Sequence, residues 1–281
     1  MARAELIARA AARLGAAGVP EPGRDARLLY RWAARIDGPG LAATLRDPAR
    51  PHEIARFEHA VAARAGRAPL SHIVGGRLFW GRRFRVTPDV LDPRPETETL
   101  IAHALEGPPA RRILDLGTGS GCILLTLLAE WPEAAGLGVD ISAAALAVAR
   151  QNARALGLAG RAGFRQGDWC GGLAEPFDLV VANPPYVSEA ELAALEPEVR
   201  EHEPRLALAG GPDGLDAVRR IAAGVGPLLS PGGRLMLEIG SGQGPAAAAI
   251  LAAAGLACAR IVADLDGRDR VAAVSHPEKT A

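Results

Sequence analysis

Asp115-Leu116-Gly117-Thr118-Gly119-Ser120-Gly121 is the stretch that decides the fold of this 281-residue chain. It ends the strand-like run from Arg112 to Leu116 and precedes the apolar, helix-forming run from Cys122 to Glu130. Alternate glycines between a strand and a helix let a ligand approach the backbone closely and permit φ values that other residues avoid. The pattern therefore predicts a nucleotide-binding turn at the carboxyl edge of a parallel sheet.

Strand and helix patterns alternate on both sides of this turn, which predicts a Rossmann-like α/β sheet covered on both faces. Further strands are expected at 136–140, 162–166, 178–182, 234–239, 257–263 and 270–274. Helices are expected at 97–105, 122–130, 143–156, 215–229 and 245–254. Only Asp264 to Gly267 separate the last two strands, so these strands should form an antiparallel hairpin.

The sequence before residue 96 has a different character. Helical periodicity over 3–17, 25–36 and 53–64 predicts a small bundle spanning residues 1–72. Short apolar runs at 78–80 and 84–86, separated by glycine, predict a β-hairpin within a connector at 73–95. The sheet domain would then occupy residues 96–281. Thr97 or Glu96 is expected to cap the first helix of that domain.

Acidic and aromatic residues at the ends of the next strands refine the expected ligand. Asp140 lies nineteen residues after Gly121, where a carboxylate accepts hydrogen bonds from ribose hydroxyls. A dinucleotide site would require glycine in place of Cys122, so the loop suits an adenosine ligand without a pyrophosphate, such as S-adenosylmethionine. Asp168 and Trp169 follow the third strand, where the acid would accept from the adenine amino group while the ring packs beside the base.

Asn183-Pro184-Pro185-Tyr186 follows the buried strand Asp178 to Ala182 at the same sheet edge. The prolines stiffen this turn and remove two backbone donors, which leaves carbonyl acceptors beside an amide oxygen and an aromatic ring. Such a set predicts a clamp for a planar –NH2 group, with Asn183 close to both the cofactor and the substrate. The turn by itself does not distinguish a glutamine amide from an adenine amine.

The composition narrows the class of protein. Acidic and basic residues balance at 32 each, so no global field favours nucleic acid or an anionic membrane. Three isolated cysteines have no metal spacing and fit a reducing compartment. No run is long and apolar enough for a signal peptide or a membrane span. We therefore expect a cytoplasmic protein without a metal site.

The chain resembles the class I S-adenosylmethionine-dependent methyltransferases and, within them, the PrmC/HemK family, which methylates a glutamine side-chain amide in peptide chain release factors. The resemblance covers nearly the whole length and includes Pro69-Leu70, 93–98, 115–121, Asp140, Trp169, 183–187, 203–205, 210–214, 238–240, Gln243, 264–267 and Arg270. The chain departs from the family pattern at His72, Asp92 and Ala209, which leaves the details of docking open.

The resemblance implies a mechanism and a partner. The Asn183 side-chain oxygen and the Pro184 carbonyl would each accept one N–H of the glutamine in the Gly-Gly-Gln motif of class 1 release factors. Pro185 and Tyr186 would pack on the amide plane, and Asn183, Pro184 and Tyr186 would be the catalytic residues. S-adenosylmethionine would give up its methyl group and leave as S-adenosylhomocysteine. The N-terminal bundle would help to dock the release factor.

Other functions remain as alternatives. The same clamp would serve methylation of a ribosomal-protein glutamine or of adenine N6 in nucleic acid. The neutral charge balance disfavours nucleic acid, and the Arg-Pro-Glu-Thr-Glu stretch at 94–98 disfavours the ribosomal-protein enzymes. A non-catalytic adapter is disfavoured by the intact clamp, and an NAD-linked oxidoreductase by Cys122.

Overall fold

The computed structural model describes residues 1–256 and 259–275, and the chain divides into two compact units. The helical unit consists of Met1–Gly76 together with Glu196–His202. The sheet unit consists of Arg77–Leu195 together with Glu203–Ala281. Neither unit is continuous in sequence, because the chain leaves the sheet unit after Leu195 and Glu196–His202 contributes one short helix to the helical unit.

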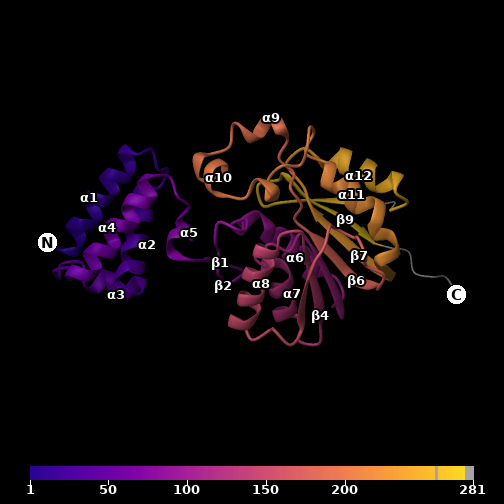
Figure 1. Cartoon of the computed structure of the whole chain (residues 1–281), viewed down its shortest axis with the longest axis horizontal. Helices are drawn as coiled ribbons and strands as arrows, with labels where there is room; N and C mark the ends of the chain where they lie inside the picture. Colours follow the sequence, from indigo (N-terminus) through magenta and orange to yellow (C-terminus); the bar gives the residue numbers. More distant parts are fainter. Residues whose placement is uncertain (257–258, 276–281) are drawn as a thin grey trace. The chain divides into compact units, whose positions relative to one another are not determined.

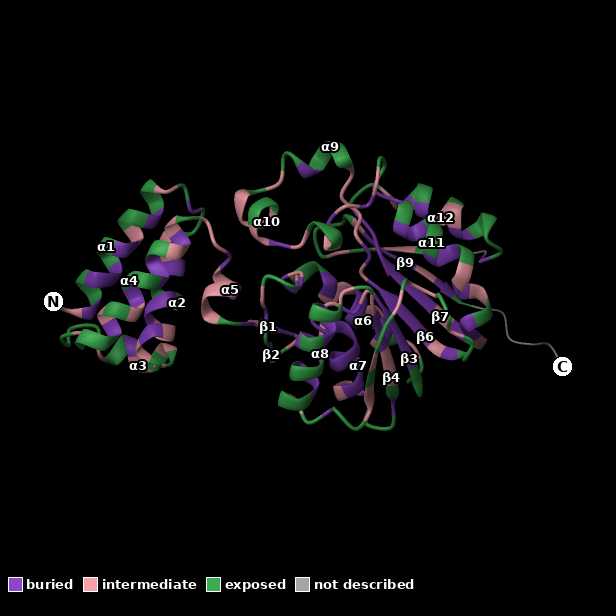
Figure 2. Ribbon diagram, viewed as in Figure 1, coloured by how far each residue is buried: buried purple, intermediate pink, exposed green. Residues whose placement is uncertain are grey.

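The helical unit is built from short amphipathic helices. Its elements are α1 (Arg3–Ala16), α2 (Pro22–Ala34), α3 (Gly38–Ala43), α4 (Pro51–Ala65), α5 (Leu70–Val74) and α10 (Pro197–His202). The buried faces of α1, α2 and α4, which are purple in Figure 2, meet in one core. Within this core the rings of Tyr30 and Phe57 pack edge to face, with their centroids 5.1 Å apart. The sequence predicts α1, α2 and α4. It misses α3, α5 and α10, which are too short to show a clear helical period.

A cluster of ionic side chains holds α10 in the helical unit. Glu198 accepts hydrogen bonds from Arg64 at 2.9 Å and from Arg67 at 2.7 Å, and Arg64 also donates to Asp25 at 2.7 Å. Burial would raise the pKa of Glu198, but hydrogen bonds from Arg67 and Arg64 outweigh it and lower this pKa to about 2. The carboxylate of Glu198 therefore stays ionised while it holds two guanidinium groups together.

Replacing Glu198 by glutamine is expected to lower the free energy of unfolding by about 2 kcal/mol, because the poorly solvated guanidinium groups of Arg64 and Arg67 lose the charged carboxylate that they share. Chemical denaturation at pH 7 measures this change. Glu58→Gln is the matched control, since Glu58 pairs with Arg13 at 3.4 Å where both side chains are about half exposed. The control should change stability by less than about 0.5 kcal/mol. Equal losses in the two variants would contradict a special role for Glu198.

The centre of the sheet unit is a seven-stranded sheet with the strand order β5-β4-β3-β6-β7-β9-β8. Its strands are β3 (Arg112–Leu116), β4 (Ala135–Asp140), β5 (Ala162–Gln166), β6 (Phe177–Ala182), β7 (Leu229–Glu238), β8 (Arg260–Ala263) and β9 (Asp269–Ser275). The pairings from β5 through β7 are parallel, whereas β9 is antiparallel to both of its neighbours. The predicted Rossmann-like sheet with an antiparallel last strand is confirmed.

Helices cover both faces of this sheet, as the alternating pattern predicts. They are α6 (Glu98–Glu106), α7 (Cys122–Glu130), α8 (Ala143–Ala155), α11 (Asp216–Val225) and α12 (Gly244–Ala253). The short helix α9 (Glu189–Leu192) lies in the loop after β6, and 3-10 turns occur at Pro95–Thr97, Arg205–Ala207 and Gly226–Leu228. Cores form between the sheet and α6 and α7 on one face, and between the sheet and α11 and α12 on the other (Figure 1). Among the described residues, none of the helices has both the length and the apolarity to span a membrane.

Alternate side chains of the central strands supply the two cores. In β3, Ile113 belongs to the core beneath α6 and α7, and Leu114 belongs to the core beneath α11 and α12. Gly136 in β4 lets α7 approach the sheet, because a Cβ at this position would come within 2.4 Å of Leu124. The central strands are thus buried on both sides, which gives the carboxyl edge of the sheet a rigid base.

Several predicted boundaries differ from the structure. The hairpin strands are β1 (Arg77–Phe79) and β2 (Arg82–Phe84), so the apolar Trp80 lies in the turn and not in a strand. The helix expected to reach residue 229 ends at Val225, and β7 already begins at Leu229 because the Pro231-Gly232-Gly233 segment continues the strand. Residues 257–258 of the strand expected at 257–263 lie outside the described residues.

Candidate active site

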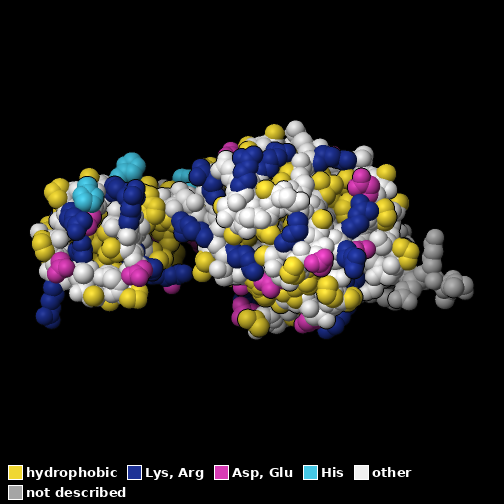
Figure 3. All heavy atoms as spheres, turned by 90° about the horizontal axis from the view of Figure 1, so that it is seen from below, with side chains coloured by type: hydrophobic (Ala, Val, Ile, Leu, Met, Phe, Trp, Pro, Cys, Tyr) yellow, Lys and Arg dark blue, Asp and Glu magenta, His cyan; other side chains and the backbone are white. Residues whose placement is uncertain are grey.

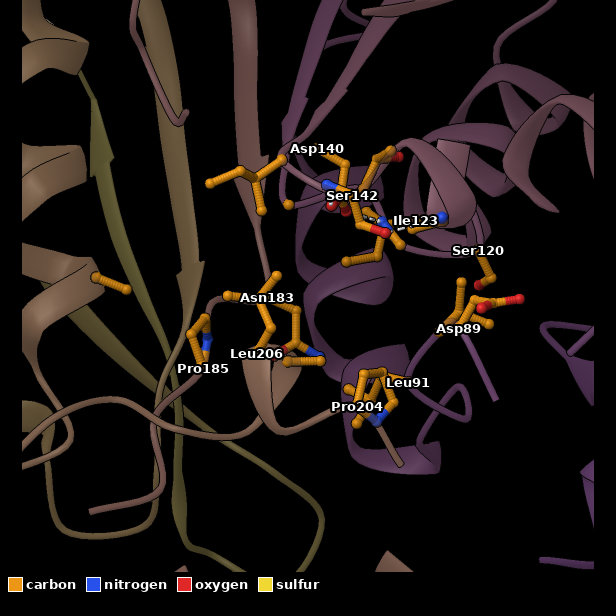
Figure 4. Close-up of a pocket in the computed structure, with 18 of the residues that line it drawn as sticks. Asp89, Leu91, Ser120, Ile123, Asp140, Ser142, Asn183, Pro185, Pro204 and Leu206 are labelled. Atoms are coloured by element: carbon orange, nitrogen blue, oxygen red, sulfur yellow. Dashed lines mark hydrogen bonds between the residues drawn. The ribbon is translucent and has the colours of Figure 1, made fainter. Parts of the chain in front are cut away.

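A cavity of about 270 Å³ opens at the carboxyl edge of β3, β4 and β6. The glycine loop, Asp140, Trp169, Asn183 and Pro185 all line it. Figure 4 shows Asp140, Asn183 and Pro185 around this cavity. The structure therefore brings together the loop after β3 and the turn after β6, as the strand order requires, because these two strands are neighbours. Tyr186 and Pro184 do not contribute to the lining.

The loop after β3 has the conformation that its glycines allow. Gly117, Gly119 and Gly121 have φ values of 71°, 54° and 79°, a region that other residues rarely adopt. Backbone N–H groups of Gly117 and Thr118 donate to the Val139 carbonyl at 2.8 and 3.0 Å, which ties the loop to β4. The loop lines the cavity, and Gly117 and Gly119 contribute only backbone to that lining.

Asp140 at the end of β4 fixes this loop from the side. Its Oδ2 accepts from the Gly119 N–H at 2.9 Å, and its Oδ1 accepts from the Ser142 N–H at 2.9 Å. Each carboxylate oxygen has a further lone pair, and the side chain lines the cavity (Figure 4). Asp140 therefore has the capacity to accept from two vicinal hydroxyl groups while it orders the loop.

Asp115 at the end of β3 supports the loop, a role that the sequence pattern did not predict. The Thr118 hydroxyl donates to Asp115 Oδ2 at 2.6 Å, and Asp115 is fully buried. Burial raises the pKa of Asp115 to about 7, although the Thr118 hydroxyl opposes this shift. A carboxyl group at the end of a buried strand, three residues before a hydroxyl, was the available signal.

Trp169 and Asp168 also line the cavity, next to the glycine loop. The Trp169 ring lies over Gly117, since a Cβ on Gly117 would come within 3.3 Å of it. The Asp168 carboxylate forms an ion pair with Arg220 of α11, and both side chains line the cavity. Arg220 is a cavity residue that sequence reasoning missed, and its pairing leaves Asp168 fewer lone pairs for a ligand.

Asn183 begins the stiff turn after β6 and is half buried. Its Nδ2 donates to the Thr97 hydroxyl at 3.1 Å. Within the described part of the chain, its Oδ1 accepts no hydrogen bond and is not among the fully buried polar atoms. The Pro184 carbonyl likewise receives no hydrogen bond from the described residues. Two acceptors without internal partners thus lie next to each other in the chain.

Gln243 and two glycines that are distant in sequence keep the backbone of Pro185 and Tyr186 in place. Gln243 donates through Nε2 to the Tyr186 carbonyl at 3.1 Å, and it accepts through Oε1 from the Gly240 N–H at 2.8 Å. A Cβ on Gly214 would come within 2.3 Å of the Tyr186 carbonyl, and one on Gly210 within 2.8 Å of the Pro185 carbonyl. These small residues allow close packing that keeps the turn in place.

Two further acids are buried near the turn, and both have raised pKa values. Burial raises the pKa of Glu203 to about 7 in spite of Arg94, which donates to it at 2.7 Å. Burial also raises the pKa of Glu238 to about 7, against the opposing effects of the Thr97 hydroxyl and the Arg270 guanidinium. Ionisation of either carboxyl group is therefore unfavourable, because the negative charge would lie where solvent cannot reach it.

Glu238→Gln is expected to reduce the pH dependence of stability. As the pH rises, Glu238 ionises near pH 4.5 in the unfolded chain but only near pH 7 in the folded protein, so folding stability is present at low pH and is lost between these values. The loss of unfolding free energy between pH 5 and pH 8 should be about 2 kcal/mol smaller in the variant. Denaturation at both pH values measures it. Glu133→Gln, an exposed control, should leave the wild-type slope unchanged.

Of the three departures from the family pattern, those at positions 92 and 209 have local explanations in the structure. Asp92 is buried and accepts a hydrogen bond from Arg77 at 2.8 Å, so an arginine of the hairpin neutralises it. Ala209 lines the cavity and forms an isolated bridge with Val187, which follows the stiff turn. Nothing in the structure explains the histidine at position 72.

The helix Glu98–Glu106 begins without the predicted cap. Neither Thr97 at its N-cap nor any side chain at the N-cap of the preceding 3-10 turn makes a capping hydrogen bond. Thr97 is instead buried, and its hydroxyl accepts from Asn183. Glu98 accepts from the Trp80 N–H at 2.7 Å and so ties the hairpin to the helix. The predicted capping role is therefore wrong for Thr97.

The strand order is that of a Rossmann-like sheet, and the family matches that follow show a methyltransferase that uses S-adenosylmethionine. Residues 93–207 match the family model described as "Methyltransferase small domain", and residues 5–75 match "PrmC N-terminal domain". The chain is 56% identical to a release factor glutamine methyltransferase of Cereibacter sphaeroides, over 99% of both chains. It is 50% identical to the one of Rhodospirillum rubrum, over 94% of this chain and 82% of that protein.

This chain belongs to the family of release factor glutamine methyltransferases. Among solved structures, it is similar to a ribosomal protein L11 methylase of Lactobacillus delbrueckii, with a TM-score of 0.48 and 20% identity over 67% of this chain and 83% of that chain. It is also similar to an RNA methyltransferase of Salinibacter ruber in complex with S-adenosyl-L-homocysteine, with a TM-score of 0.44 and 22% identity over 68% and 97% of the two chains.

Proposed function

We propose that this protein transfers the methyl group of S-adenosylmethionine to the side-chain amide nitrogen of the glutamine in the Gly-Gly-Gln motif of class 1 peptide chain release factors. One observation carries the proposal beyond family membership. Asn183 Oδ1 and the Pro184 carbonyl have no hydrogen-bond donor among the described residues, beside a cavity lined by the glycine loop and Asp140. A primary amide carries two N–H groups, which match these two acceptors.

The residues of the cavity fit S-adenosylmethionine. We assign the glycine loop from Gly117 to Gly121 to the amino acid part of the cofactor and Asp140 to the ribose hydroxyls. Trp169 and Asp168 would border the adenine, with Asp168 sharing its carboxylate with Arg220. An added Cβ at Gly117 would reach the Trp169 ring, so glycine keeps this part of the cavity open. The bound cofactor supplies an electrophilic methyl group.

The clamp answers the low reactivity of an amide nitrogen, whose lone pair is delocalised into the carbonyl. Asn183 and Pro184 hold both N–H groups and thereby direct the nitrogen lone pair towards the cofactor side of the cavity. Positive charge that develops on the nitrogen meets oxygen dipoles that are already oriented. Pro185 and Tyr186 provide the surfaces against which the amide plane packs. The proton leaves after transfer, when the nitrogen is far more acidic, so the clamp needs no strong base.

The helical bundle at 1–72 is the proposed docking region for the release factor, with 73–95 as connector and 96–281 as the methyltransferase domain. The proposed site of action is the cytoplasm, where translation terminates, and the free thiols of Cys122 and Cys170 fit a reducing compartment. Direct nucleic acid binding is not part of the proposal. On the face seen in Figure 3, basic side chains of the sheet unit occur at several separate places.

Incubation with methyl-labelled S-adenosylmethionine and a purified class 1 release factor, followed by peptide mapping, tests this function. Label is expected on the glutamine of the Gly-Gly-Gln loop and should be absent from a release factor whose glutamine is replaced by alanine. Parallel reactions contain ribosomal proteins and DNA. Label only on a ribosomal protein or on DNA would overturn the proposal.

A further inference from the structure

The amide of Asn183 must face one way to work as a clamp. Its Oδ1 accepts from the substrate only if its Nδ2 is directed elsewhere, and a flipped amide would present two donors to the substrate N–H groups. Proline at positions 184 and 185 restricts the backbone of the turn but leaves the side-chain amide free to rotate about χ2. Something outside the turn has to fix its orientation.

Thr97 is in the right place for this task. Its hydroxyl accepts the Nδ2–H of Asn183 at 3.1 Å, and Thr97 is only 1% exposed, so no bulk water competes for this contact. The hydroxyl is free for it because Thr97 caps no helix, although it occupies the N-cap position of α6. The two residues are 86 positions apart in the sequence.

A hydroxyl can donate as well as accept, so Thr97 alone would not decide the direction of the hydrogen bond. Glu238 at the end of β7 supplies the direction. It is fully buried, and the Thr97 hydroxyl is among the groups that favour its ionised form against the larger effect of burial. Neither carboxylate oxygen makes a hydrogen bond of regular geometry with a described residue, so each oxygen retains capacity to take the Thr97 proton. Above about pH 7, where Glu238 is ionised, its carboxylate only accepts, and the Thr97 hydroxyl then directs its lone pairs towards Asn183.

We propose that Thr97 is a positioning residue of the methyl transfer, which together with Glu238 holds the Asn183 amide with Oδ1 towards the substrate. The inference rests on the proposed function, because it names how the proposed clamp is oriented. The Tyr186 hydroxyl also acts on Glu238, so the same buried carboxylate is coupled to both ends of the stiff turn. Thr97 itself lies at the cavity, and its proposed effect on the reaction is exerted through the Asn183 amide.

Paired substitutions at position 97 separate a hydroxyl role from a packing role. Thr97→Val keeps the shape and removes the acceptor, whereas Thr97→Ser keeps the acceptor and removes a methyl group. We expect Thr97→Val to lower kcat for release factor methylation by about 10- to 100-fold, because a misplaced reacting group costs about that much. Thr97→Ser should stay within about threefold of wild type, and both variants should keep KM and cofactor Kd within about threefold. Glu238→Gln, which can also donate, should lower kcat by about 10-fold.

Nuclear magnetic resonance provides a readout that does not depend on turnover. The side-chain amide signals of Asn183, assigned by their absence in Asn183→Ala, should shift in Thr97→Val and keep their wild-type positions in Thr97→Ser. Unchanged signals and wild-type kcat in Thr97→Val would overturn the positioning role, and so would an equal loss of kcat in the valine and serine variants. Absence of methylation by the wild-type enzyme would instead overturn the proposed function, while the amide signals would still report on the orientation.

Discussion

Asn183→Ala should lower the turnover of release factor methylation by about 100-fold or more, while the Kd for S-adenosylmethionine changes by less than about threefold. The variant removes one of the two oxygen dipoles that face the developing charge on the amide nitrogen. Single-turnover rates with saturating cofactor measure the effect, and titration calorimetry measures cofactor affinity.

Gln166→Ala is the matched control for this experiment. Gln166 also carries a side-chain amide at the end of a strand, where its Nε2 donates to the Ile141 carbonyl at 2.9 Å, but it does not line the cavity. This control should keep wild-type turnover. Wild-type turnover in Asn183→Ala with bound cofactor would contradict the clamp.

Asp140→Ala should raise the Kd for S-adenosylmethionine by about 100-fold, since the ribose hydroxyls and the Gly119 N–H lose the same charged acceptor. The glycine loop loses its lateral contact at the same time. Calorimetry with the cofactor product S-adenosylhomocysteine measures the affinity without turnover.

Asp178→Ala controls for the general cost of losing such a carboxylate. Asp178 Oδ2 accepts from the N–H groups of Arg111 and Arg112 at 3.0 and 2.9 Å, at the beginning of β3 and far from its carboxyl end. The two variants should lose similar stability, and only Asp140→Ala should lose cofactor affinity. Equal affinities for the cofactor product would contradict the role proposed for Asp140.

The sequence was sufficient for features that depend on local pattern. Alternating strand and helix periods predicted the sheet, and the four residues from Asp264 to Gly267 were too few for a crossover, which predicted the antiparallel β9. Residues next to β3 and β6 were placed at one cavity because the carboxyl ends of neighbouring parallel strands share an edge. Because β3 and β6 are neighbouring strands, the two motifs that follow them form one site.

Features that depend on side-chain pairing between distant segments were not predictable. Thr97 looked like a helix cap because local rules favour that role, but its hydroxyl is used by Asn183. Arg220 gave no local signal of its ion pair with Asp168. The hairpin strand was misplaced at Trp80, since hydrophobicity favoured a strand where the chain turns with a φ of 46°. In each case a tertiary contact overrode a local preference.

The ion pairs of the helical unit affect the order in which parts of the chain can fold during synthesis. Arg64 and Arg67 leave the ribosome about 130 residues before Glu198, which is their shared counter-charge. During synthesis, Arg64 in the nascent N-terminal helices is paired with Asp25 but not yet with Glu198, and Arg67 lacks both Glu196 and Glu198, until residues 77–195 of the sheet unit have been made. An isolated fragment that ends at Gly76 would keep this unfinished state permanently. The helical unit can therefore complete its fold only after the segment that follows the stiff turn and contains Glu198 has been synthesised.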